Sequence, residues 1–174
     1  TQAESSAASD VYKRQQRVSG ELLQLNTGVL LELMQDRPAR AERIVVSIHS
    51  DADSSESSLM RELFALTAQS NIDLYRQQPA RALARFNEQW GRIEMLGVGP
   101  FGALRAMALW ARLGVALAAA RQGVGGARVV VNSCLSALRW SPFPHSRFWV
   151  QLGTAALADI DGQAGRALSR LVRL

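Results

Sequence analysis

The chain has 174 residues, of which 48% are hydrophobic and 20% charged, and Cys134 is its only cysteine. This length suffices for one domain or for several small stacked units, and a single cysteine excludes an internal disulfide. The formal charge of +5 is uneven, because residues 1–94 sum to −2 whereas residues 95–174 carry nine Arg and two Asp and sum to +7. These Arg residues are spread singly along the chain, so a basic helical domain that touches nucleic acid is our third interpretation.

The first sixteen residues differ in character from the rest of the chain. The stretch from Ser5 to Gln15 contains Lys13, the only lysine, and resembles translated sequencing-adapter read-through. We therefore expect residues 1–16 to be a non-native or disordered leader, and residues 17–174 to form the folded part. No secretory signal is visible, and we expect a cytoplasmic location.

Beyond this leader, apolar residues recur with the 3.6-residue period of an α-helix. Pro38 and Pro79 each stand where a first helical position would be, since a missing N–H costs nothing there. The apolar segment 103–120 contains Arg105 and Arg112, each of which would cost about 2.5–3.5 kcal/mol near a bilayer centre. We therefore expect it to be a buried helix of a soluble protein. The pattern predicts helices at about 18–34, 38–48, 59–75, 79–93, 103–121, 127–140, 148–160 and 164–174.

The stretch from Leu59 to Trp90 is predicted to be an antiparallel helical hairpin, and similar hairpins recur along the chain. Pro38-Ala39-Arg40-Ala41 returns as Pro79-Ala80-Arg81-Ala82, with weaker echoes around Arg128 and Arg166. The four Arg positions are 41, 47 and 38 residues apart, and periods of this size are typical of helical-hairpin solenoids. We predict an all-α fold of about four antiparallel helical hairpins stacked as a tetratricopeptide-like solenoid. An ordinary helical bundle with chance similarity between its turns is the other interpretation.

Several of these residues also resemble a known family. The resemblance is to the C-terminal tetratricopeptide-like regions of some bacterial multidomain serine/threonine protein kinases. It is carried by Asn71–Arg76, Pro79–Leu83 with Trp90, Leu104–Arg112 with Ala116–Ala120, Ala155–Ala158, and Ala164–Leu168. The resemblance implies a regulatory or partner-binding arm whose kinase domain lies elsewhere, because this chain has no lysine outside the leader and no His-Arg-Asp or Asp-Phe-Gly motif.

The alternative hypothesis is a fragment of a dinucleotide-binding oxidoreductase. Gly97, Gly99 and Gly102 have the G-x-G-x-x-G spacing of a phosphate-binding loop before a helix, and Val129–Val131 could be the next strand. The acidic residue expected about 20 positions later is missing, since no Asp or Glu lies between Glu94 and Asp159.

We predict no catalytic residue, no cofactor and no metal site. His49 and His145 lie far apart, without Cys or carboxylate at ligand spacing. We expect a protein or peptide partner, or another domain of the same parent chain, and no membrane. Large aromatic side chains can line a peptide groove or pack between helices. The candidate partner contacts are Trp110, Arg112, Trp140, Arg147 and Trp149.

Overall fold

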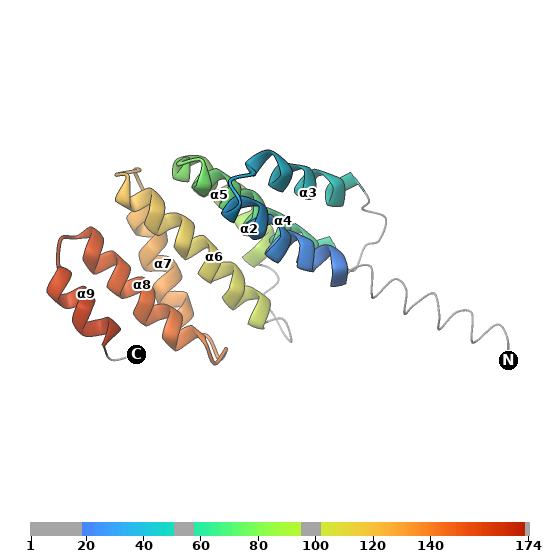
Figure 1. Cartoon of the computed structure of the whole chain (residues 1–174). Coiled ribbons are helices and arrows are strands. Elements are labelled where there is room, and N and C mark those ends of the chain that lie inside the picture. The colour runs from blue at the N-terminus through green and yellow to red at the C-terminus, as the bar shows by residue number, and fades with distance from the viewer. Residues whose placement is uncertain (1–18, 51–57, 95–101, 173–174) are drawn as a thin grey trace, which may run out of the picture. The chain divides into compact units, whose positions relative to one another are not determined.

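The computed structural model describes residues 19–50, 58–94 and 102–172. Every regular element in these ranges is helical, which confirms the predicted all-α class (Figure 1). The chain divides into two compact units, residues Thr1–Tyr75 and Arg76–Leu174, and each is described by itself. The leader predicted at residues 1–16 lies outside the described residues.

The first unit consists of an interrupted helix followed by two α-helices. The chain is helical from residue 19, passes through a π-helical segment η1 (Gln24–Gly28) and continues as α2 (Val29–Met34). Helices α3 (Pro38–Ser50) and α4 (Ser58–Tyr75) follow. Helix α2 packs against α3, and α4 packs against both of them and against η1. The sequence predicted this helix at 18–34 but not the π-helical turn inside it.

The core of the first unit is built from the apolar stripes that the sequence shows. Leu25, Val29 and Leu33 of the first helix are buried, and so are Ala68 and Ile72 of α4. Each fully buried side chain of this size contributes about 1.5–3 kcal/mol to folding.

Two polar contacts accompany this core. Tyr75 is 40% exposed, and its hydroxyl donates a hydrogen bond to Oδ1 of Asp36. Arg61 forms an ion pair with Glu21, with 2.8 Å between Nη2 and Oε2.

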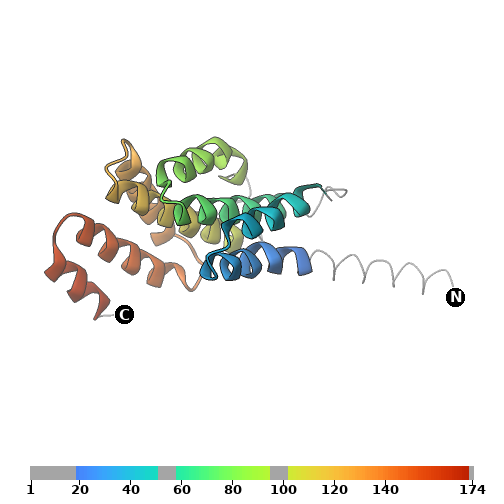
Figure 2. The same cartoon turned by 45° about the horizontal axis from the view of Figure 1, so that its top comes forward.

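In its described residues, 76–94 and 102–172, the second unit consists of five α-helices. They are α5 (Pro79–Glu94), α6 (Gly102–Arg121), α7 (Ala127–Arg139), α8 (Ser146–Ile160) and α9 (Ala164–Leu171). Each helix packs against the next one along the chain, and α6 also packs against α8. Both views show α8 and α9 side by side at the C-terminal end of this unit (Figure 2).

Helix α6 is the central helix of the second unit. It packs against α5, α7 and α8, and its buried residues include Leu109, Leu113 and several alanines. Among the described helices it is the one long and apolar enough to cross a membrane, a test that the core helix of a soluble protein also passes. Gly153 of α8 lets that helix approach closely, since a Cβ there would lie 2.7 Å from Cδ2 of Leu113 and 2.9 Å from Cδ2 of Leu135.

The turns before α3, α5 and α9 share one backbone conformation. Asp36, Gln77 and Gly162 each have φ between 57° and 72°, and each lies two residues before its helix. After Asp36, the N–H of Arg37 donates to the carbonyl of Glu32, and after Gly162 the N–H of Gln163 donates to the carbonyl of Ala158. Gly123 has a positive φ as well, and the N–H of Val124 after it donates to the carbonyl of Ala119. This turn is two residues longer than the others, because Gly123 lies four residues before α7. The repeated sequence therefore coincides with a repeated turn.

The structure bears on the strand and the glycine loop of the dinucleotide-binding hypothesis. The strand considered at Val129–Val131 is wrong, because these residues form the first turns of α7, where Val131 is buried and Val129 is exposed. Of the glycine loop, Gly97 and Gly99 lie outside the described residues, and Gly102 is the first residue of α6. The predicted pairing of α4 with α5 stays a prediction, since the two helices belong to different units.

Candidate functional site

A cluster of aromatic rings lies where α6 meets the start of α8. The indole rings of Trp110 on α6 and Trp149 on α8 are stacked, with 5.4 Å between their centroids and 13° between their planes. The ring of Phe143 lies 5.4 Å from that of Trp149, and the His145 ring lies 5.3 Å from Phe143. Both tryptophans are only partly buried, so part of each side chain is exposed to solvent.

The loop before α8 positions the outer half of this cluster. Pro142 and Pro144 prevent α7 from continuing, because each disfavours helix in the residue before it. The N–H of Phe143 donates to Oγ of Ser141 at 3.3 Å, and the N–H of Ser146 donates to the carbonyl of Phe143 at 3.0 Å. Ser146 is fully buried, so the loop is held against the helix that it starts.

An apolar groove adjoins the aromatic stack. It has a volume of about 420 Å³ and lies between α6, α8 and α9. Trp110, Leu117, Leu152, Ala156 and Leu171 are among its lining residues. The groove exists because α8 and α9 present small side chains to this space. Its volume lies toward the lower end of the roughly 300–1,000 Å³ that ligand pockets usually have.

Arg121 and Asp159 also line the groove and form an ion pair that joins the end of α6 to the end of α8. Both side chains are more than half exposed, so the pair adds little to stability. It places one charge of each sign beside apolar surface.

Arg112 of α6 is used within the fold, where it contacts α5. Its guanidinium carbon lies 4.1 Å from the centroid of the Trp90 ring, and Nη2 donates to Oδ1 of Asn87 at 2.8 Å. Burial lowers the pKa of Arg112, although Cys134 and Glu94 act in the opposite direction. Arg112 thus ties α6 to α5, and this role accounts for its conformation without a partner.

The remaining predicted contact residues lie apart from the stack. Trp140 follows the end of α7 and is 84% exposed, while Arg147 is exposed in the first turn of α8. His145 is exposed as well, and its side chain does not cap α8. The structure therefore brings together Trp110 and Trp149 of the five candidates, and it places Arg112 against α5.

The titratable groups of this unit offer little chemistry. Burial raises the pKa of the Cys134 thiol to about 11, so at neutral pH it is a protonated, inaccessible group on α7. Within residues 19–50, 58–94 and 102–172, His, Cys, Asp and Glu side chains do not gather in a group able to hold a metal ion. What the arrangement supplies is apolar contact area, ring faces and a few charges.

Sequence reasoning missed the contribution of α9 to this site. Ala167 and Leu171 line the groove, and their four-residue spacing on an amphipathic helix was the available signal. Comparison with protein-family models, with curated proteins and with solved structures finds no match for this chain.

Proposed function

We propose that this chain is a non-catalytic helical-repeat module that binds a peptide or protein partner in the groove between α6, α8 and α9. The observation that carries the proposal is the partly exposed stack of Trp110 and Trp149 beside a mostly apolar groove. Aromatic side chains supply large, rigid contact area and are enriched at the centres of protein interfaces.

The arrangement of helices supports a tetratricopeptide-like solenoid as the scaffold. Such arrays place the first helix of one hairpin against the first helix of the next, and α6 and α8 are in contact in this way. The same left-handed turn before α3, α5 and α9 is what repeated hairpins of one origin would share. Solenoids of this kind commonly bind partners along extended surfaces.

The cellular context that we propose comes from the sequence resemblance alone. The module would be a regulatory or partner-binding segment of a larger cytoplasmic bacterial serine/threonine kinase, with no reaction of its own. The contiguous sequence of the parent gene tests this directly. A β3 lysine with His-Arg-Asp and Asp-Phe-Gly motifs in the same reading frame supports the proposal, and their absence refutes the kinase context.

The binding function is tested by selecting peptides from a displayed library on the purified chain. Ala156→Trp fills the groove from α8 at a position that is not itself part of the Trp110–Trp149 stack. Ser136→Trp adds the same side chain to an exposed position of α7 and is the matched control. We expect selected peptides to bind the wild type and Ser136→Trp equally, and Ala156→Trp at least about tenfold more weakly, a difference of about 1.4 kcal/mol. Peptides that bind all three proteins alike would refute the groove as the binding site.

A further inference from the structure

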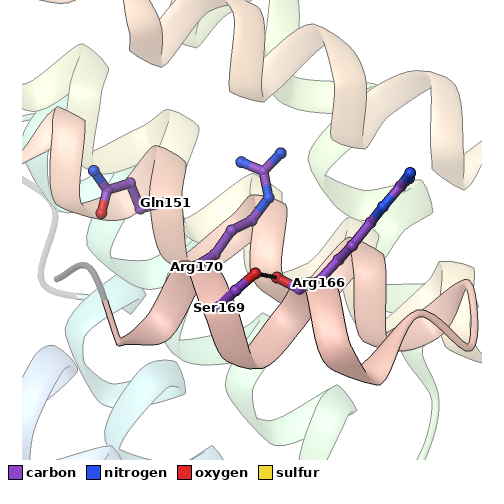
Figure 3. Close-up of a pocket in the computed structure, with 4 residues that line it drawn as sticks. All are labelled: Gln151, Arg166, Ser169 and Arg170. Carbon is purple, nitrogen blue, oxygen red and sulfur yellow. Dashed lines mark hydrogen bonds between the residues drawn. The ribbon is translucent and has the colours of Figure 1, made fainter.

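A second, polar hollow lies on the hairpin of α8 and α9 (Figure 3). It has a volume of about 380 Å³ and is lined by Gln151 of α8 and by Arg166, Ser169 and Arg170 of α9. It shares none of these residues with the apolar groove, although the same two helices carry both. The hollow is therefore a separate feature, with a different chemistry.

The positive charge of this hollow is not balanced within the fold. The two carboxylates nearest in sequence are both engaged elsewhere, Asp159 with Arg121 and Asp161 with Arg128. Arg166 donates from Nη1 to Oε1 of Gln163 at 3.0 Å. Throughout the part of the chain that the structure describes, no carboxylate is paired with Arg166 or Arg170.

The two guanidinium groups are arranged as a pair. Arg166 and Arg170 are four residues apart on one helix, and Figure 3 shows both side chains extending from α9 to the same side. Four residues of an α-helix rise about 6 Å. Alternate side chains of an extended peptide lie on one face about 6.6–6.8 Å apart. The two spacings match, so two acidic side chains of an extended segment can each meet one guanidinium.

The remaining groups favour a carboxylate over a phosphate group. Phosphate sites commonly use free backbone N–H groups at the start of a helix, whereas Arg170 lies in the last turn of α9, away from those groups. The Ser169 hydroxyl donates to the carbonyl of Arg166 at 3.1 Å, so its proton is already used (Figure 3). Two guanidinium groups remain, and each can bind a carboxylate through two parallel N–H···O bonds.

We propose that Arg166 and Arg170 bind two carboxylate side chains at alternate positions of an extended acidic segment on a partner protein. This site is independent of the apolar groove. Its occupant is defined by charge and by spacing, and the surrounding basic stretch, at +7 over residues 95–174, strengthens the attraction.

The test measures the affinity of fluorescein-labelled octapeptides for the full chain by fluorescence anisotropy at low salt. One probe alternates Glu and Ser four times, and a second has the same composition in the order Glu-Glu-Ser-Ser-Ser-Ser-Glu-Glu, which contains no two Glu at alternate positions. We expect the alternating probe to bind several-fold more tightly, and Arg166→Gln/Arg170→Gln to weaken it about tenfold. Raising the salt concentration should weaken it as well.

The matched control is Arg40→Gln/Arg43→Gln, which removes two exposed charges from α3 and should leave binding unchanged. Ala156→Trp, which fills the groove, should also leave it unchanged, so failure of one site does not count against the other. Binding of the alternating probe weaker than about 1 mM would overturn the proposal, and so would equal loss in the α3 variant. A probe with phosphoserine in place of Glu that binds more than about tenfold tighter through the same two arginines would make the hollow a phosphate site and overturn the carboxylate assignment.

Discussion

A methyl group added at Gly153 tests the packing of α8 in the second unit. The new Cβ would lie 2.7 Å from Cδ2 of Leu113 and 2.9 Å from Cδ2 of Leu135. Leu113 is fully buried and Leu135 is 6% exposed, so both side chains have little room to move. Adding one carbon to a filled core costs about 1–3 kcal/mol.

Helix propensity acts in the opposite direction and must be separated from this cost. Replacing Gly by Ala inside a helix stabilises it by about 0.8–1 kcal/mol. We therefore expect Gly153→Ala to lower the free energy of unfolding by about 1 kcal/mol net. Gly114 of α6 is exposed and has no atom within 4 Å of its ideal Cβ, so Gly114→Ala should raise the free energy of unfolding by about 0.5–1 kcal/mol.

The pair of variants isolates the packing term, because both make the same chemical change in the interior of a helix. Urea denaturation followed by tryptophan emission measures it, since the four tryptophans, at positions 90, 110, 140 and 149, all lie in the second unit. The two free energies should differ by about 1–3 kcal/mol, with equal m-values. If Gly153→Ala is as stable as Gly114→Ala, the close approach of α8 to Leu113 and Leu135 is wrong.

Three further outcomes are expected. Burial raises the pKa of Cys134 from 9.0 to about 11, so the stability it contributes is complete below pH 9 and is lost between pH 9 and 11. Denaturation at these pH values should show a loss of about 2–3 kcal/mol that Cys134→Ala abolishes, and an identical loss in that variant would contradict the assignment. The hydrogen bond to Asp36 raises the pKa of Tyr75. Asp36→Asn, whose new residue also suits the left-handed turn, should lower this pKa toward 10.0 in a tyrosinate absorbance titration. An unchanged titration curve would exclude that hydrogen bond. Arg112→Gln should lower the free energy of unfolding by about 1–2 kcal/mol. Arg112→Lys should restore only part of this stability, because an ammonium group cannot stack flat on Trp90. Urea denaturation curves like that of the wild type for both variants would show that the contact with Trp90 does not stabilise the fold.

The helices were predictable because each has a complete local signal. Pro38 and Pro79 mark helix starts, and the stripe through Leu25, Val29 and Leu33 has the helical period that the core requires. Boundaries agree within about two residues for most of the helices, although the final helix was expected to extend to residue 174 and α9 ends at Leu171. The π-helical turn at Gln24–Gly28 has no local signal, because its residues would also suit an ordinary α-helix.

The candidate site was only partly predictable, because it depends on contacts between distant residues. Trp110 and Trp149 are 39 positions apart, and whether two such rings stack at the surface or pack in a core depends on how α6 meets α8. The sequence suggested Arg112 as a partner contact, but its guanidinium group lies over the Trp90 ring and donates a hydrogen bond to Asn87 of α5. The pair Arg166 and Arg170 becomes visible only once Asp159 and Asp161 are seen to be engaged with other arginines.

The shared turn before α3, α5 and α9 has a consequence for how this chain can vary. A left-handed residue two positions before each of these helices gives the chain the same local backbone conformation at that point. Cutting and rejoining the chain at two such turns would preserve that local conformation. Asp36 and Gln77 adopt this conformation without being glycine, and glycine or asparagine at either place would relieve local strain and make such exchanges easier.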